Sequence, residues 1–471
     1  MKTENPPNPT QPEEPPGRTR KSPWYHLPDA NWQDWRWQMA HLLTKKEDFS
    51  EFLQLTSDEI QAFNSPGLFR VGVTPYFANL IDPHDPDCPI RRQVIPTIAE
   101  REVSQDEMVD SLGEDKHSPV PGLVHRYPDR VLMLVNTQCA SFCRFCTRSR
   151  LVGDTHTQFS SNNYQQQIDY IAANPVVRDV LLSGGDPLLL SIKTLEGILS
   201  SLREIPHVEV IRIGSRVPIF LPMRVNPELV SMLSKYHPLW MNIHVNHPRE
   251  ITPEVEAALA QLANAGIPLG SQTVLLANIN DCPQIMKGLF HKLVQNRVRP
   301  YYLYQCDQVA GSSHFRTSVA AGLEIMENLR GHTSGFAIPT YVIDAPQGGG
   351  KVPILPQYLL SQSVRSVVIR NYEGLITSYT QPLENSRHNH TTCPACLSAN
   401  HNAGQQGIAA LLSGEQRSII PETWNQNHQR SMPLPANLQP RVSIPKIDQP
   451  AKTVRAALWA SREEPSKGDQ Q

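Results

Sequence analysis

Three closely spaced cysteines are the residues of this chain best suited to chemistry. Cys139, Cys143 and Cys146 form a C-x3-C-x2-C pattern directly after the apolar run 131–135. Cysteine thiolates are the ligands that iron–sulfur clusters take, and three of them hold three irons of a [4Fe–4S] cube. No other cysteine lies close by in the sequence. The pattern therefore predicts a cluster whose fourth iron is open to another molecule.

A zinc site is the alternative for the same three cysteines. Zinc usually takes four protein ligands, arranged in pairs such as C-x2-C, and the triplet fits that arrangement poorly. A cluster with an open iron is destroyed by oxidation, so the sequence also predicts a reducing, cytoplasmic compartment.

A glycine-rich segment that ends in a lysine is the second chemical feature. Residues 344–351 read Asp-Ala-Pro-Gln-Gly-Gly-Gly-Lys. Glycines let a backbone approach an anionic group closely, and a lysine in a pocket of low polarity can form a Schiff base with an aldehyde such as pyridoxal phosphate (PLP). Taken alone, the segment reads more readily as a surface loop with a solvated Lys351. The spacing and following hydroxyl residue of a P-loop are missing.

Short apolar runs alternate with amphipathic segments around these two features. This alternation predicts an α/β fold of β/α units about a parallel sheet, and six units make an open (βα)6 partial barrel. Catalytic groups on such barrels sit where strand C-termini meet loops, which is where the cysteines fall. The expected strands cover 131–135, 179–182, 208–213, 240–245, 270–275 and 301–304, and the expected helices cover 164–173, 195–202, 254–265 and 284–295.

Composition limits the partners and divides the chain. The 471 residues carry 43 Lys and Arg against 45 Asp and Glu, and no run of 18 apolar residues occurs. Neither nucleic acid nor a membrane is therefore an expected partner. Proline-rich residues 1–22 are expected to be disordered, residues 23–120 to form a helical region, residues 121–375 to form the barrel and residues 431–471 to form a loose tail.

Four stretches in one order resemble the lysine 2,3-aminomutase family. They are residues 139–150, 299–307, 329–335 and the glycine–lysine segment, and the likeness runs from about residue 32 to residue 415. The resemblance implies the open barrel and the interconversion of L-α-lysine and L-β-lysine by radical amino migration. One electron, from a reductant such as flavodoxin or ferredoxin, passes through the cluster and splits S-adenosylmethionine (SAM) into a 5′-deoxyadenosyl radical. PLP holds the migrating nitrogen as an aldimine.

The resemblance also implies roles for single residues. Lys351 is expected to carry PLP as an aldimine, Arg148 to bind the substrate carboxylate, and Asp307 and Asp344 to bind the ε-ammonium. Two carboxylates around one ammonium form a costly like-charge pair when the site is empty. Further candidates are Arg126 and Arg130 for the PLP phosphate, Ser183, Gly184, Gly185 and Asp186 for the amino group of SAM, and His244 and Gln272 for SAM or PLP. Phe145 stands where better-known members carry histidine, so a hydrogen bond is expected to be lost there.

The remaining cysteines imply a second metal site. The family binds zinc between subunits, and Cys282, Cys393 and Cys396 match three of its ligands. The fourth position falls near Thr391, which cannot serve well, so His390 is expected to complete the site, with His388 as the alternative. Segment 376–430 is therefore expected to bind zinc and to join subunits into a homo-oligomer. Reduced cysteines without metal remain the competing interpretation.

Four other functions fit parts of the sequence. An aminomutase acting on a lysine of elongation factor P belongs to a shorter group that lacks the C-terminal cysteines. A glutamate aminomutase would not keep acidic residues at both Asp307 and Asp344, because its substrate side chain is an anion. Arginine 2,3-aminomutase could use the same acidic pair and stays open. A non-catalytic iron–sulfur or zinc scaffold protein would not need Lys351.

Overall fold

The computed structural model describes residues 22–153, 161–363 and 365–380. Contacts divide the chain into two compact units. The larger comprises Met1–Leu360 and Ile369–Thr377, and the smaller comprises Ser361–Val368 and Ser378–Gln471. The predictions for residues 1–21 and for the chain beyond residue 380 lie outside the described residues.

The N-terminal part of the larger unit consists of short helices because the sequence starts and stops them often. Asp34 accepts a hydrogen bond from the backbone of Arg36 at the start of α2, and Thr56 and Glu59 form a capping box at the start of α4. Beyond α5, three short 3-10 turns follow in the stretch up to residue 117. The helices are α1 Asp29–Trp32, α2 Trp35–Ala40, α3 Lys46–Ser50, α4 Ser57–Phe63 and α5 Pro75–Ala78.

A nine-stranded sheet forms the centre of the larger unit, with its strands in chain order. The seven strands β2 to β8 are parallel, whereas β1 and β9 pair antiparallel at the two edges. The predicted α/β barrel-like fold is confirmed, with one more parallel strand than the six expected. The strands are β1 Leu123–Tyr127, β2 Arg130–Asn136, β3 Asp179–Gly184, β4 Val210–Ser215, β5 Leu239–His244, β6 Leu269–Leu275, β7 Val298–Gln305, β8 Thr340–Ala345 and β9 Gly350–Pro353.

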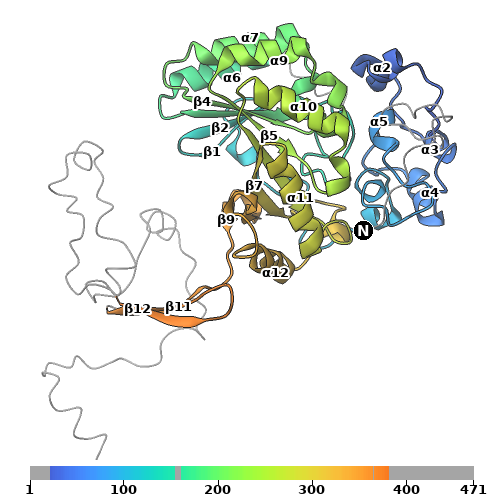
Figure 1. Ribbon diagram of the computed structural model, residues 1–471. Coiled ribbons are helices and arrows are strands. Elements are labelled where there is room, and N and C mark those ends of the chain that lie inside the picture. The colour runs from blue at the N-terminus through green and yellow to red at the C-terminus, as the bar shows by residue number, and fades with distance from the viewer. Residues whose placement is uncertain (1–21, 154–160, 364, 381–471) are drawn as a thin grey trace, which may run out of the picture. The chain divides into compact units, whose positions relative to one another are not determined.

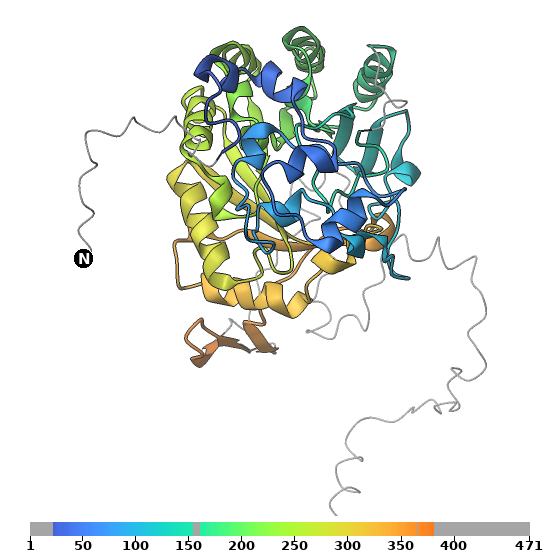
Figure 2. The ribbon, with the colours of Figure 1, turned by 90° about the vertical axis from the view of Figure 1, so that its right-hand side faces the viewer.

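Helices cover the outer face of this sheet (Figures 1 and 2). Most begin at a polar N-cap residue. Asn226 before α9 and Thr252 before α10 are examples, and in both helices the first residue is proline. None of the described helices is long and apolar enough to cross a membrane. The helices are α6 Ser161–Ala173, α7 Ile192–Arg203, α8 Val217–Phe220, α9 Pro227–Leu233, α10 Pro253–Asn264, α11 Pro283–Gln295 and α12 Val319–Leu329. A separate three-stranded sheet contains β10 Leu359–Gln362, β11 Ser366–Arg370 and β12 Ile376–Thr380.

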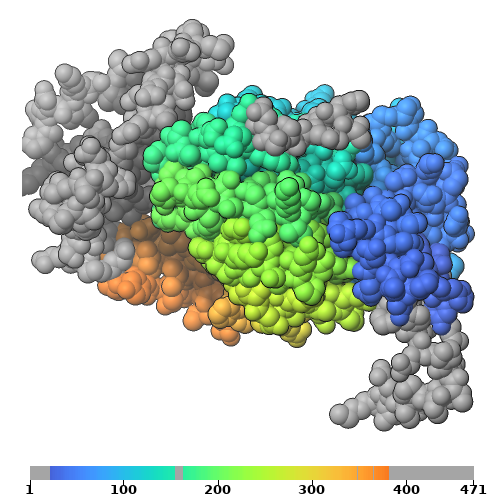
Figure 3. Space-filling model, turned by 90° about the horizontal axis from the view of Figure 1, so that it is seen from above, coloured from blue at the N-terminus to red at the C-terminus, as the bar shows by residue number. Residues whose placement is uncertain are grey.

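The N-terminal helices and the barrel share one hydrophobic core. Phe77 packs edge-on against Phe220 with ring centroids 4.5 Å apart, and the Tyr76 hydroxyl lies 2.6 Å from that of Thr252. Figure 3 shows the N-terminal residues, in blue, lying against the green and yellow barrel. These contacts join the N-terminal region to α8 and to the start of α10.

The sheet does not close on itself through backbone pairing. Its edges β1 and β9 are instead bridged by side chains: the Tyr127 hydroxyl accepts a hydrogen bond of 2.9 Å from the Lys351 backbone, and Arg126 Nε donates to the Gly348 carbonyl. We refer to this bridged gap between β1 and β9 as the seam.

The loop that carries the three cysteines is anchored by a buried ion pair. Arg144, between the second and third cysteine, donates from Nε to Glu100 at 2.9 Å, and both side chains are buried. The same guanidinium bonds to the carbonyls of Phe69 and Arg70 at 2.8 and 2.9 Å. The N-terminal region thus holds the cysteine loop in place.

Changing Glu100→Ala should destabilise the protein strongly. It leaves the Arg144 charge buried without its partner, a loss of about 3–5 kcal/mol in proteins. Denaturant unfolding would measure the change. The matched control is Glu209→Ala, which breaks the exposed ion pair with Arg178 and should change stability little because exposed pairs contribute little. Equal effects of the two changes would contradict the anchoring role.

Candidate active site

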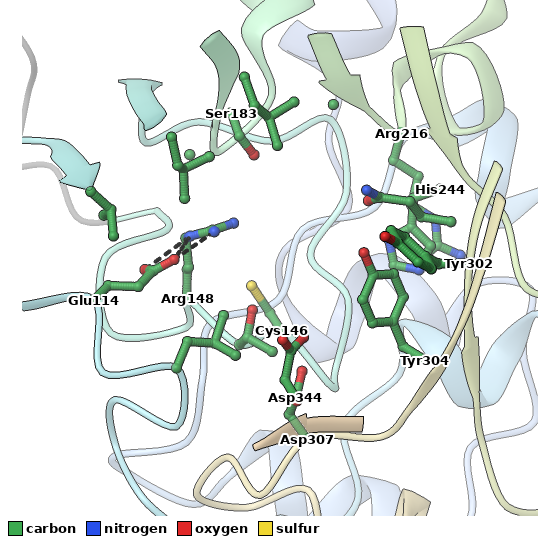
Figure 4. Close-up of a pocket in the computed structure, with 18 of the residues that line it drawn as sticks. Glu114, Cys146, Arg148, Ser183, Arg216, His244, Tyr302, Tyr304, Asp307 and Asp344 are labelled. Carbon is green, nitrogen blue, oxygen red and sulfur yellow. Dashed lines mark hydrogen bonds and ion pairs between the residues drawn. The ribbon is translucent and has the colours of Figure 1, made fainter. Parts of the chain in front are cut away.

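A cavity of about 670 Å³ lies among the C-terminal ends of the parallel strands. It is within the size range of small-molecule sites. The structure brings the predicted cluster, cofactor and substrate residues of the barrel to this one cavity (Figure 4), while their individual roles stay predictions. These lining residues are Arg126, Arg130, Cys139, Cys143, Cys146, Arg148, Ser183, Gly184, Gly185, Asp186, His244, Gln272, Asp307, Asp344 and Lys351.

The three cysteines line the cavity as free thiols in the loop after β2. Burial is the largest cause that raises the pKa of each thiol, and together with the neighbouring Cys143 it raises the pKa of Cys146 to about 12. Without metal the thiols are therefore held neutral, and a bound metal would favour the thiolates.

The donor set fits a cluster better than a single ion. Among residues 22–153, 161–363 and 365–380, no three His, Cys, Asp or Glu side chains converge on one metal-ion position. A single zinc ion needs such convergence, whereas in a [4Fe–4S] cube each thiolate binds a different iron. This geometry favours the cluster over the zinc alternative for the triplet.

Two glycines at the end of β3 allow the chain to pass against the cysteine loop. Gly184 has a φ of 117°, and a Cβ there would lie 2.4 Å from the Asn136 carbonyl oxygen. A Cβ on Gly185 would lie equally close, 2.4 Å, to the carbonyl oxygen of Gln138. Only glycine fits such an approach. Ser183 and both glycines thereby lie on the cavity wall beside the cysteines.

Asp186, the fourth residue predicted for SAM, has a structural part that its sequence position did not reveal. Its carboxylate accepts hydrogen bonds from the Ser215 hydroxyl at 2.8 Å and from the backbone of Leu188, Arg216 and Val217 at 2.7–3.1 Å. These donors use the acceptor capacity of a carboxylate. Asp186 therefore ties the ends of β3 and β4 together, and its side chain is not free to bind SAM.

His244 and Gln272 lie opposite each other on the neighbouring strands β5 and β6. Burial, and then the charge of Arg216, lowers the pKa of His244 well below its usual range, so the imidazole is neutral. Its Nε2 lies 3.2 Å from Asn246 Oδ1. Phe145 packs edge-on against this imidazole at 5.8 Å and against Phe315 at 5.7 Å. Phe145, where a hydrogen bond is predicted to be lost, thus packs against two aromatic rings.

Lys351 reaches into the cavity from β9. It stands opposite Asp344 of β8, and its Nζ lies 3.0 Å from Asp344 Oδ1 and 5.2 Å from the ring centroid of Tyr304. Arg126 of β1 donates to the Gly348 carbonyl, and Arg130 of β2 has its guanidinium 4.1 Å from the Tyr127 ring and pairs with Asp129. Two cations beside a glycine segment form a cradle that fits the phosphate of PLP.

Arg148 is oriented by a residue that the sequence did not single out. Glu114, 34 residues earlier, accepts from its Nε at 3.0 Å and its Nη2 at 2.6 Å. Figure 4 shows this carboxylate beside the guanidinium. Nη1 forms no hydrogen bond with any residue that the structure describes, so one edge of Arg148 remains for a substrate carboxylate. Glu114 is the residue before the short 3-10 turn Asp115–His117, and no periodicity marks it.

Asp307 and Asp344 lie side by side on the cavity wall (Figure 4). Burial, and then the negative charge of Asp344, raises the pKa of Asp307 to about 7, and the Lys351 ammonium opposes this rise. The two carboxylates therefore repel each other in a buried place, and their predicted role of binding one substrate ammonium stays a prediction.

The predicted zinc site falls mostly outside the described residues. Cys282 is partly exposed at the N-cap of α11, away from the residues that line the cavity. Cys393, Cys396 and His390 belong to the part of the chain that the structure does not describe. Zinc binding therefore stays a prediction.

Comparisons with known proteins agree with this geometry. Residues 133–286 match the model of the Radical SAM superfamily, and residues 326–439 match a Lysine-2,3-aminomutase model. The chain is 50% identical to an L-lysine 2,3-aminomutase of Clostridium subterminale over 85% of this chain and 95% of that one. It is 53% identical to the L-lysine 2,3-aminomutase of Fusobacterium nucleatum over 79% of this chain and 87% of that one.

A relative of different named specificity is also close. A glutamate 2,3-aminomutase of Clostridioides difficile is 45% identical over 74% of this chain and 82% of that one. Relatives of both specificities therefore share most of their length with this protein. The chain belongs to the lysine 2,3-aminomutase family of radical SAM enzymes.

Proposed function

We propose that this enzyme interconverts L-α-lysine and L-β-lysine. The observation that carries the proposal is the ammonium already present at the acidic end of the cavity. Lys351 Nζ lies 3.0 Å from Asp344, and the charge of Lys351 also acts on Asp307. A lysine substrate carries the same ammonium on the same four-carbon stem. The acid pair is thus shaped and charged for the side chain that the proposal requires.

A glutamate substrate fits this end of the cavity poorly. Its side-chain carboxylate would add a third negative charge beside Asp307 and Asp344. Carboxylates that lie close together in a buried site repel one another, so that some of them stay protonated. The acid pair accordingly argues against glutamate as the substrate of this protein. An arginine substrate would satisfy the same pair and is an outcome of the test below.

The residues of the chain position and protect the reacting groups. When bound, the cluster with SAM supplies a carbon radical and PLP supplies a ring that delocalises it. Arg148, held by Glu114, binds the α-carboxylate, and the acid pair binds the ε-ammonium, so that the substrate is fixed at both ends. Ser183, Gly184, Gly185, Gln272 and His244 are the proposed contacts for SAM, and Arg126, Arg130 and Lys351 are those for PLP. The cavity walls exclude water from the radical.

Zinc, subunit association and the electron donor complete the proposal. Cys282, Cys393, Cys396 and His390 are the proposed zinc ligands, joining two copies of the chain into a homo-oligomer. The cluster needs one electron, for which a small redox protein such as flavodoxin or ferredoxin is the proposed source. Metal analysis of the full-length protein tests zinc binding, and measurement of its molecular mass in solution tests subunit association.

Anaerobic turnover with SAM, PLP and dithionite tests the substrate assignment. Lysine, arginine, glutamate and norleucine should be compared at equal concentrations, with identification of the products. Lysine is expected to have the highest kcat/KM and to give the β-amino acid. Faster turnover of arginine would make arginine, which is also a cation, the assigned substrate in place of lysine. Faster turnover of glutamate would overturn the proposed role of the acid pair.

Changing Asp307→Asn should raise the KM for lysine by about tenfold or more, because one charge partner of a buried ammonium is removed. With a pKa of about 7, Asp307 is protonated below that pH, and lysine then has to displace the proton. The KM of the unchanged enzyme should therefore fall as pH rises towards 7, by up to about tenfold per unit. Asp307→Asn should lose this pH dependence. Equal losses on lysine and norleucine would show that Asp307 does not recognise the ammonium.

A further inference from the structure

A buried arginine outside the predicted set touches one of the three cysteines. Arg216, which follows β4, donates from Nη1 to Cys143 Sγ at 2.8 Å. Its side chain is only 6% exposed, and it lines the cavity. A hydrogen bond from a full positive charge to a thiolate is stronger than one from a neutral donor. The contact therefore places a fixed cation against a proposed ligand of the cluster.

The position of Arg216 is set by a polar network behind it. Nη2 donates to Gln93 Oε1 at 2.6 Å and to Glu250 Oε2 at 3.0 Å, and Glu250 is fully buried. Gln93 in turn donates to Glu250 Oε1 at 3.0 Å. The backbone groups of Asn246 and His247 also donate to Glu250, at 3.0 and 2.8 Å. The guanidinium is thus held rigidly and cannot turn away from Cys143.

Two aromatic rings flank the same guanidinium and keep its surroundings apolar. Its carbon lies 4.2 Å from the ring centroid of Phe220 and 5.7 Å from that of Phe145. Arg216 Nε is buried and finds no hydrogen-bond partner among the described residues. An unsatisfied buried donor on the wall of a ligand cavity indicates that a bound group supplies the missing acceptor. A cluster held by Cys143 would bring sulfur atoms to this wall.

We propose that Arg216 is a positioning residue that raises the reduction potential of the cluster through Cys143, and that Glu250 partly offsets its charge. The proposal rests on the cluster assignment of the proposed function. One electron from an external low-potential donor converts the 2+ cluster to the 1+ state, which adds one negative charge. A fixed cation and a hydrogen bond to a ligand sulfur both favour the reduced state, and cluster potentials respond to these two influences.

The arrangement predicts effects of opposite sign for two neighbouring residues. Removing the charge in Arg216→Met should lower the ratio of reduced to oxidised cluster at a fixed potential by about tenfold. This change corresponds to a fall of about 59 mV in the one-electron reduction potential of the cluster. Removing the negative charge in Glu250→Gln should raise the same ratio. Arg216→Lys should restore part of the effect, since it keeps the charge but loses the paired hydrogen bonds.

Potentiometric titration of the anaerobically reconstituted full-length protein tests the proposal. The electron paramagnetic resonance signal of the reduced cluster is followed without SAM, and the iron and sulfide content of each variant is measured first. The matched control is Arg212→Met, which removes a cation of β4 from the same cavity wall, where it pairs with Asp179 at 2.8 Å. It should leave the potential nearly unchanged.

Each outcome decides the question. Opposite shifts in Arg216→Met and Glu250→Gln support the proposal. An unchanged potential in a fully loaded Arg216→Met variant overturns it, and so does weakened SAM binding with no shift, which would assign Arg216 to SAM. If Arg216→Met does not fold, Arg216→Lys and Glu250→Gln still give the sign. If the wild-type protein itself contains no iron and sulfide after reconstitution, the cluster assignment is wrong, and with it the proposed function.

Discussion

Alanine at Cys146 is expected to remove the iron–sulfur cluster and with it all cleavage of SAM. Two remaining thiolates cannot hold a cube that leaves one iron open. Because even outer partners of metal ligands change activity by 10–100-fold, the loss should exceed about 100-fold. Release of 5′-deoxyadenosine from SAM under dithionite measures it, alongside iron and sulfide content.

The control for this experiment is another buried thiol. Cys88 lies in the hydrophobic core and does not line the cavity. Cys88→Ala should therefore keep about four irons and four sulfides per chain. Normal iron content and normal SAM cleavage in a variant without Cys139, Cys143 and Cys146 would rule the cluster assignment out.

Alanine at Lys351 is expected to abolish amino migration while sparing the cluster. The residue is the proposed attachment point of PLP, and loss of a residue that forms a covalent intermediate lowers turnover by about 10³-fold or more. The variant should still bind SAM, because Lys351 lies on β9 and not in the cysteine loop. Formation of β-lysine and binding of SAM would be measured on the same preparation.

Borohydride reduction gives an independent measure of the same assignment. In the unchanged enzyme it should fix the cofactor on the peptide that contains Lys351. Lys292→Ala is the matched control, since Lys292 bonds to the carbonyl of Pro248, outside the cavity. A label on any other lysine would show that the glycine segment is only a loop.

The parallel strands could be predicted because each is an apolar run that stands out from its neighbours. All six expected strands occur, with ends shifted by no more than a few residues. Strand β8 was missed because its apolar run, residues 341–343, is short and is followed at once by Asp344. The edge strands β1 and β9 were missed for a related reason: they are short, and β9 contains glycine and an exposed lysine.

The candidate site could be predicted in part. Strand ends and the cysteine pattern locate it, and the family resemblance supplies residues such as Arg148. The partners that hold these residues come from distant parts of the chain. Glu114 reaches Arg148 from 34 residues away, and Arg216 reaches Cys143 from 73 residues away. Such contacts depend on the fold, and no local spacing records them.

The seam between β1 and β9 gives the cavity a wall of uneven strength. Elsewhere the wall is a ladder of backbone hydrogen bonds, whereas at the seam the described contacts include only single side-chain bonds, such as that from the Lys351 backbone to Tyr127. Each such bond contributes about 0.5–1.5 kcal/mol, so parting the seam requires far less free energy than parting two strands. The edge between β1 and β9 is therefore the most weakly joined part of the described nine-stranded sheet, and the segment that bears Lys351 forms one side of it.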